Sequence, residues 1–199
     1  MERNLRKKAE YKSAIRSRKM IREAFMELLK EKDIKKITVT DIITKADLNR
    51  TTFYAHYPDV RGITEEIENE VIDKMLEILK KFEFKNFFSN PTPLLLEVSR
   101  FLENNQDTYK VLLKVNDAET FLKKLKNIFA NYMMSDTDIP EYLKDSKMVN
   151  LRISYFAGGI INMYQNWFNG SLDCSLNDIA LEVSKLLSLE AKELFKRKD

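Results

Sequence analysis

Residues 37–57 read ITVTDIITKADLNRTTFYAHY, and this stretch decides the fold. Thr38 is followed three residues later by Asp41, a capping box that predicts the start of a helix. An interruption at Asp47 ends that helix after about two turns, and Asn49 is a good N-cap for the next helix. The stretch therefore predicts two short helices joined by a tight turn.

Apolar residues mark the faces on which these helices pack. The stripe of the first short helix consists of Val39, Ile42, Ile43 and Ala46, and that of the second of Phe53 and Tyr57. A longer amphipathic helix over residues 13–32 precedes them, with Ile21, Phe25, Leu28 and Leu29 at helical spacing. Two short helices braced by a longer one predict a helix-turn-helix, whose second short helix enters the major groove of DNA.

Helical periodicity continues along the rest of the chain. With only four Gly and four Pro in 199 residues, the sequence lacks the frequent punctuation that strands and turns require. Further helices are expected over residues 60–81, 94–104, 107–114, 118–134, 146–169 and 176–196. The predicted fold class is all-α, with about nine helices.

Charge divides the chain into two parts. Residues 1–64 contain 16 Lys or Arg against 9 Asp or Glu, a difference of +7, whereas residues 65–199 contain 18 against 22, a difference of −4. A basic N-terminal part favours a polyanion such as nucleic acid, because contacts with phosphates release condensed counterions. The acidic remainder has no such attraction.

Several classes of protein are disfavoured by composition. Cys174 is the one cysteine, so no disulfide can form within the chain, and no zinc-binding pattern is present. No apolar run approaches the roughly 20 residues of a membrane-spanning helix, and no apolar signal core follows the basic N-terminus. We expect a cytoplasmic protein that binds no metal, cofactor or membrane.

The helix-turn-helix also resembles a known family. Thr52-Phe53-Tyr54, followed by His56-Tyr57-Pro58, is similar to the end of the recognition helix in TetR-family transcriptional regulators. The resemblance is specific over residues 13–80, and the order and length of helices extend it over the whole chain. It implies a DNA-binding domain over residues 1–60, a connecting helix over 61–81, and an effector-binding and dimerisation domain over 82–199.

The resemblance also implies roles for individual residues. Arg50 and Thr51 occupy the start of the recognition helix, where family members contact base edges, and Arg50 suits the O6 and N7 atoms of a guanine. Contacts with DNA phosphates, which set the register without reading sequence, are expected from Thr38, Thr52, Tyr54, His56 and Arg61. The alternative is that Tyr54 and His56 are packed or exposed surface residues. Phe53 and Tyr57 are assigned to the core.

The chain departs from the family pattern at two positions. Asp47 stands where members usually have Gly, a change that is tolerable because Asp enters the left-handed region more readily than most residues. Val60 replaces a Lys that anchors phosphate, and Arg61 is turned about 100° around the helix. A basic N-terminal arm can compensate by contacting the DNA backbone or minor groove; it consists of Arg3, Arg6, Lys7 and Lys8.

The family's later helices form the dimer and bind a small effector. Apolar stripes in the last two helices favour a four-helix dimer interface, although each stripe can also pack within one chain; the candidates are Gly158, Ile161, Val183 and Leu187. Gly158-Gly159, Trp167 and Asn169-Gly170 resemble a Firmicutes-type subgroup related to dihydroxyacetone-kinase regulators. Candidate effector-pocket residues, which can equally be core, are Phe101, Tyr109, Phe121, Phe129, Met133 and Met163.

The resemblance implies a homodimeric repressor that binds a palindromic double-stranded DNA operator and is released by an unknown small effector. Alternatives are an activator, or an interaction module that no longer binds DNA. An enzyme is disfavoured, because the chain has one His, one Cys, no P-loop and no dinucleotide-binding fingerprint. Paired carboxylates among Glu65, Glu66, Glu68 and Glu70 are interpreted as a solvated helix face.

Overall fold

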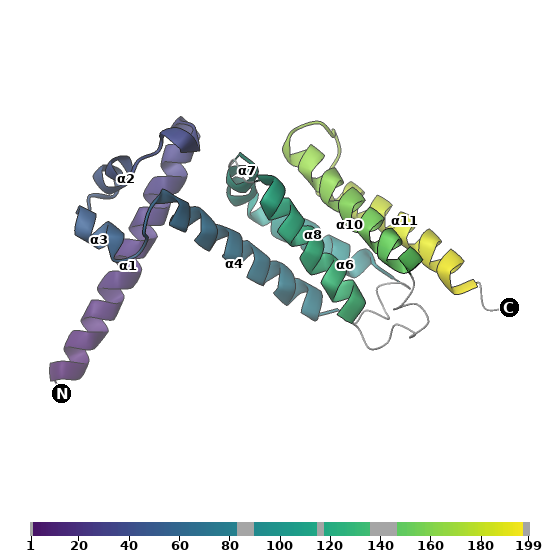
Figure 1. Cartoon of the computed structure of the whole chain (residues 1–199), viewed down its shortest axis with the longest axis horizontal. Coiled ribbons are helices and arrows are strands. Elements are labelled where there is room, and N and C mark those ends of the chain that lie inside the picture. The colour runs from purple at the N-terminus through teal and green to yellow at the C-terminus, as the bar shows by residue number, and fades with distance from the viewer. Residues whose placement is uncertain (1, 83–89, 115–117, 136–146, 197–199) are drawn as a thin grey trace. The chain divides into compact units, whose positions relative to one another are not determined.

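The computed structural model describes residues 2–82, 90–114, 118–135 and 147–196 (Figure 1). Over these ranges the chain forms nine α-helices, one short 3-10 helix and no strand, so the predicted all-α fold class is confirmed. In chain order the elements are α1 (Glu2–Glu31), η1 (Ile34–Lys36), α2 (Val39–Ala46), α3 (Arg50–Tyr54), α4 (Val60–Lys80), α6 (Thr92–Asn104), α7 (Gln106–Lys114), α8 (Ala118–Ser135), α10 (Lys147–Phe168) and α11 (Leu176–Lys196).

Helix α1 differs most from its expected bounds. The apolar stripe predicted a start near residue 13, whereas α1 begins at Glu2. Residues 2–12 contain Arg, Lys, Glu, Leu and Ala, which are good helix formers, but their few apolar residues make no packing stripe that would reveal a helix. The residues proposed as an arm, Arg3, Arg6, Lys7 and Lys8, therefore belong to a helical extension of α1.

The chain divides into two compact units, residues 1–69 and 70–199, and the division falls within α4. In the N-terminal unit α1 packs against α2 and α3, which lie beside it in Figure 1. The fully buried core side chains of this unit include Ile21, Phe25, Ile42, Phe53 and Ile63. They come from all four helices, so the core fixes α2 and α3 against α1.

In the C-terminal unit α11 packs mainly against α6, and α10 packs against α8. Helices α10 and α11 also contact each other and run side by side in Figure 1. Leu95 and Leu102 of α6, Phe121 of α8 and Ala180 of α11 are buried between these helices. No helix in the described part of the chain is long and apolar enough to cross a membrane.

Candidate nucleic-acid interface and C-terminal cavity

Local hydrogen bonds build the start of α2 and the turn that leads from α2 to α3. The Asp41 backbone N–H donates to Thr38 Oγ1 (3.2 Å), and the Thr38 backbone N–H donates to Asp41 Oδ2 (2.8 Å), so the capping box forms as expected. Asp47 adopts the left-handed conformation (φ 52°, ψ 49°) that the family's Gly would adopt. Asn49 Oδ1 then caps α3 by accepting from the Thr52 backbone N–H (2.8 Å). This short-range chemistry fixes the angle at which α3 leaves the turn.

The residues expected to read bases lie on the exposed side of α3. Arg50 and Thr51 are exposed at its first turn, whereas Phe53 on the opposite side is fully buried. Arg50 Nη2 donates to Thr40 Oγ1 of α2 (2.8 Å). Thr40 was not predicted as a partner of Arg50, since a contact over ten residues depends on the angle between two helices. Thr40 holds the guanidinium at the edge of the motif.

Two of the residues expected to contact phosphates have partners within the N-terminal unit. The Thr52 hydroxyl donates to Asn49 Oδ1 (3.0 Å), so it can accept but has no second hydrogen to donate. His56 Nε2 lies 2.8 Å from Ser17 Oγ of α1. The Ser17 hydroxyl also lies 3.0 Å from the Ser13 carbonyl, which can only accept. We therefore expect the Ser17 hydrogen to go to that carbonyl and His56 Nε2–H to donate to Ser17.

Ser17 was not predicted as a partner of His56, although its position on the apolar face of α1 is a signal in the sequence. It is buried on α1, where the neighbouring positions of the apolar face hold Ile21 and Ala24. A serine on a packing face needs a partner, and His56 supplies it. The contact leaves His56 Nδ1 as the ring nitrogen that can face DNA.

The remaining residues expected to contact phosphates differ in their exposure and in the internal contacts that they make. Tyr54 is half exposed, with 51% of its surface accessible. Thr38 is committed to the capping box, because its hydroxyl donates to Asp41 Oδ2 (2.7 Å). Arg61 is exposed, and its Nε lies 3.2 Å from Glu65 Oε1 one turn along α4. An exposed pair of this kind is weak enough for a DNA phosphate to displace.

A cluster of charged side chains, partly exposed to solvent, joins α1 to α4. Arg18 Nε donates to Glu66 Oε2 (2.9 Å), and Arg22 Nη1 donates to Glu66 Oε1 (3.0 Å). Burial opposes ionisation of Glu66, but the hydrogen bonds from Arg18 and Tyr57 and the charges of Arg18 and Arg22 together outweigh it, so the pKa of Glu66 lies below its usual value. Burial raises the pKa of the neighbouring Tyr57 hydroxyl to about 12.

This cluster corrects the interpretation of the four glutamates as a solvated face. Glu66 is paired with two arginines, and Glu68 is buried with 7% of its surface accessible. The lowered pKa keeps the Glu66 carboxylate ionised, the opposite of what a general acid requires. Over the described residues, no group of three or more His, Cys, Asp or Glu side chains could hold a metal ion.

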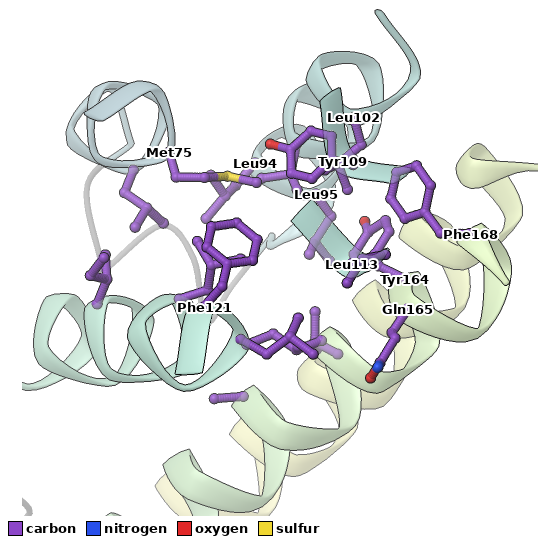
Figure 2. A pocket seen from close by; sticks show the side chains of 18 residues that line it. Met75, Leu94, Leu95, Leu102, Tyr109, Leu113, Phe121, Tyr164, Gln165 and Phe168 are labelled. Carbon is purple, nitrogen blue, oxygen red and sulfur yellow. The ribbon is translucent and has the colours of Figure 1, made fainter. Parts of the chain in front are cut away.

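The C-terminal unit contains an apolar cavity of about 110 Å³. Figure 2 shows its eighteen lining residues, which come from α4, α6, α7, α8 and α10. Of the predicted pocket residues, Tyr109 and Phe121 line the cavity, but Phe101 and Met163 do not. The ring of Phe101 instead packs edge-on against Tyr109 (5.9 Å between centroids). The side chains of Phe129 and Met133 lie outside the described residues.

The two tyrosines of the cavity wall differ in their hydrogen bonds. The Tyr164 hydroxyl lies 2.9 Å from Ser99 Oγ, and Ser99 Oγ donates to the Leu176 carbonyl (3.0 Å). The Tyr109 hydroxyl is buried and has no hydrogen-bond partner within the described residues. Burial raises the pKa of Tyr109, so the hydroxyl stays protonated at neutral pH. It is an unused donor at the wall of an apolar cavity.

The residues expected at a dimer interface are buried or partly buried within their own chain. Val183 and Leu187 of α11 are buried, with 2% and 5% of their surface accessible, and Ile161 lines the cavity. Gly158 is partly buried, and a Cβ added there would lie 4.0 Å from Lys126 Nζ. Val183 and Leu187 therefore pack within their own chain, because an apolar stripe does not reveal its partner, and a role for them in a dimer stays a prediction. Among the side chains that the structure describes in α10 and α11, the exposed large apolar ones are Leu151, Tyr155, Leu181, Leu186 and Leu189.

The Trp167 motif terminates α10. Gly170 has a positive φ of 73°, and the Ser171 backbone N–H donates back to the Asn166 carbonyl (2.8 Å). Gly suits this left-handed position, where an added Cβ would be strained. Trp167 Nε1 donates to the Cys174 carbonyl (2.8 Å), which ties the following loop to α10. These contacts give the motif a structural role.

Comparison with known proteins now identifies the family. Residues 89–189, just over half of the chain, match the TetR family described as "Transcriptional regulator C-terminal region". This chain belongs to the TetR family of transcriptional regulators. Its homologues are regulators and not enzymes.

Relatives and solved structures agree with this assignment. Over 107 residues, the chain is 33% identical to the uncharacterized HTH-type transcriptional regulator YxbF of Bacillus subtilis (strain 168). That match covers 54% of this chain but 26% of YxbF, so the chain spans about a quarter of the length of that relative.

The fold is also similar to two solved structures. One is the dihydroxyacetone kinase operon activator DhaS, with a TM-score of 0.61, 21% identity, and coverage of 89% of this chain and 97% of DhaS. The other is a TetR transcriptional regulator from Streptococcus agalactiae 2603V, with a TM-score of 0.63, 22% identity, and coverage of 90% and 97%. At these identities the likeness concerns the fold alone.

Proposed function

We propose that this TetR-family protein acts in the cytoplasm as a homodimer that binds a palindromic DNA operator and represses transcription. The observation that carries the proposal is the exposure of Arg50 and Thr51 at the first turn of α3, opposite the buried Phe53. A helix anchored on one face and polar on the other can enter the major groove without unfolding the motif. Arg50 then meets a guanine and Thr51 meets a thymine methyl group.

Phosphate contacts are assigned to residues that flank α3. Tyr54 and Arg61 are exposed, and His56 can donate from Nδ1 when its ring is protonated, since Nε2–H is engaged by Ser17. Thr38 and Thr52 can donate to a phosphate only by releasing Asp41 and Asn49, because their hydroxyl hydrogens and backbone N–H groups are all used internally. The basic excess of residues 1–64 draws this unit toward DNA.

The dimer is assigned to the exposed apolar side chains of α10 and α11. Tyr155 is 76% exposed, and Leu151 lies one turn before it on the same helix. On α11, Leu181 and Leu189 are eight residues apart and share a face. Paired operator half-sites require a two-fold dimer. In such a dimer the exposed apolar side chains of α10 and α11 would be covered by the same helices of a second copy.

Effector release is assigned to the cavity of the C-terminal unit. Helix α4 contributes Met75 and Leu79 to the cavity wall, and its first half carries Ile63 and Ile67 in the core of the N-terminal unit. A ligand that binds one position of α4 more tightly than another therefore shifts the population of DNA-competent molecules. Activation is the second candidate, since DhaS, which shares the fold, is an operon activator.

Gel retardation tests the proposal. The purified protein should retard the promoter region of its own gene at concentrations at least tenfold lower than it needs for random DNA of equal length. Equal retardation of both fragments, or of neither, would favour an interaction module over a regulator. A reporter gene driven by that promoter then separates repression from activation.

A further inference from the structure

The lining of the cavity restricts the chemistry of what can enter it. Its eighteen side chains comprise thirteen aliphatic residues, four aromatic residues and Gln165, and none of them is charged. An ionised ligand would lose its hydration there and gain no counter-charge, which is strongly unfavourable. The lining therefore selects an uncharged and mostly apolar molecule.

The hydroxyl group of Tyr109 in the cavity wall favours a ligand that carries a hydrogen-bond acceptor. The Tyr109 side chain is 97% buried, judged from its 3% accessible surface, and its hydroxyl has no partner among the described residues. The ring is held between Phe101 at 5.9 Å and Phe168 at 5.4 Å, centroid to centroid. A buried hydroxyl without a partner is unfavourable, and a ligand acceptor removes that cost.

The other polar groups of the wall do not make the same demand. Ser99 donates to the Leu176 carbonyl, so Tyr164 donates its own hydrogen to Ser99. Gln165 is only partly buried, so its amide is not cut off from water in the way that the Tyr109 hydroxyl is. A single hydrogen-bond acceptor on the ligand, placed near Tyr109, therefore gives a partner to the one buried polar group of the described wall that lacks one.

The volume sets the size of the molecule. The cavity measures about 110 Å³, somewhat less than an engineered apolar cavity of about 150 Å³ that holds benzene. A single ring, or a short chain of similar bulk, is the size that fits, and a substituent on the ring requires the cavity wall to move outward.

We propose that the effector of this protein is an uncharged organic molecule of single-ring size that carries one hydrogen-bond acceptor for the Tyr109 hydroxyl. The proposal rests on the proposed function only in calling this molecule the effector. The binding chemistry itself follows from Tyr109 and the apolar lining, and it can be tested without DNA.

Three molecules of nearly equal shape test the chemistry directly. Acetophenone carries a carbonyl oxygen, α-methylstyrene replaces that oxygen with a CH₂ group, and benzoate replaces the methyl ketone with a charged carboxylate. The chain has one tryptophan, and Trp167 packs edge-on against Phe168 of the cavity wall (5.1 Å). Its single indole N–H signal in ¹H–¹⁵N NMR spectra can therefore report the dissociation constant of each probe.

We expect acetophenone to bind about five- to tenfold more tightly than α-methylstyrene, the size of one net hydrogen bond. Benzoate should bind at least tenfold more weakly than acetophenone. Tyr109→Phe should bring acetophenone and α-methylstyrene within twofold of each other. Tyr164→Phe is the matched control, because it removes a hydroxyl that already has a partner, and it should preserve the preference of the wild-type protein.

Four results would overturn the proposal: no binding of any probe at millimolar concentration, equal affinity for the ketone and the hydrocarbon, preference for benzoate, or a preference that survives Tyr109→Phe. Retardation of the promoter fragment with and without acetophenone is measured separately. A Tyr109-dependent ketone preference supports the assigned chemistry even if DNA binding is unchanged. In that case it is the effector-release part of the proposed function that fails.

Discussion

Arg50 is the residue on which sequence recognition depends in this account. Its guanidinium is exposed and is held by Thr40 Oγ1 at 2.8 Å, so it is partly positioned before DNA arrives. A bidentate contact with guanine contributes about 1–3 kcal/mol of discrimination. Arg50→Ala should therefore weaken binding to the preferred site by about ten- to a hundredfold and leave binding to random DNA within about threefold.

Arg61→Ala is the matched control for Arg50, since it removes the same charge at a position assigned to phosphate. It should weaken binding to the preferred site and binding to random DNA by similar factors, and it should reduce the salt dependence of binding by about one counterion. Fluorescence anisotropy titrations at several salt concentrations measure both effects. Equal losses on specific and random DNA for Arg50→Ala would contradict its role as a reader.

His56 provides a second test at the residue scale. It is the one histidine in the chain, so its ring nitrogens give unambiguous NMR signals. The hydrogen bond to Ser17 predicts the Nε2–H tautomer for the neutral ring. ¹⁵N NMR at high pH should show this tautomer in the wild-type protein and a mixture in Ser17→Ala.

Ser13→Ala is the control for that experiment, because Ser13 contributes its backbone carbonyl and not its side chain to the Ser17 contact. The variant should keep the wild-type tautomer. Ser17→Ala should also reduce the free energy of unfolding by about 0.5–1.5 kcal/mol. A predominant Nδ1–H tautomer in the wild-type protein would contradict the assigned hydrogen-bond direction.

At the scale of the element, the capping box predicts a pH dependence of stability. Hydrogen bonds from Lys32 and then Thr38 lower the pKa of Asp41 to about 2, against about 3.9 in an unfolded chain. A lowered folded-state pKa means that the stabilisation is present above pH 4 and is lost as the pH falls toward 2. Thermal unfolding between pH 5 and pH 2 measures this loss.

Asp41→Asn isolates the contribution of that carboxylate. The variant should be less stable than the wild-type protein at pH 5, and the difference should shrink steadily toward pH 2. Asp33→Asn is a control, because Asp33 caps the separate element η1 and should leave the pH dependence of α2 in place. A difference that stays constant from pH 5 to pH 2 would show that Asp41 does not act through its charge.

The helix boundaries show which elements can be predicted from sequence. Thr38 and Asn49 marked the starts of α2 and α3 correctly, because a capping side chain acts on backbone groups only a few residues away. The start of α1 at Glu2 was missed, since its first turns carry no apolar stripe. Local chemistry is visible in the sequence, whereas a polar helical extension is not.

Contacts between elements were harder to predict. Val183 and Leu187 were expected at a dimer interface, but they face the core of their own unit. Thr40 and Ser17 were missed as partners of Arg50 and His56, because both contacts depend on how two helices cross. Periodicity reveals that a face is buried, but it does not reveal what buries it.

At the scale of the whole molecule, the central expectation is a homodimer formed through α10 and α11. We expect a mass of two chains at micromolar concentration in analytical ultracentrifugation. Tyr155→Asp places a charge in the proposed interface and should weaken the dimer at least tenfold. Tyr11→Asp is the matched control, since Tyr11 is exposed on α1, away from α10 and α11 in sequence. A monomeric wild-type protein, or a Tyr155→Asp variant that dimerises normally, would contradict this interface.

The separation of a DNA-binding part from the rest of the chain was predicted from its charges, because the basic excess is confined to residues 1–64. Family membership extends this to a regulator with a separate C-terminal region. Tyr109 and Phe121 were among the predicted pocket residues, and both line the cavity. That the Tyr109 hydroxyl has no partner among the described residues could not be predicted, because it depends on how five helices pack.

Selection of DNA fragments from a random pool by the purified protein tests the central claim most directly. We expect enrichment of an inverted repeat whose half-sites lie about one or a few helical turns apart, each about 10–10.5 base pairs. Guanine should recur at the same position of both half-sites, and the Arg50→Ala variant should lose that preference alone. A pool that stays random after repeated rounds, or that converges on a single unpaired site, would contradict the account.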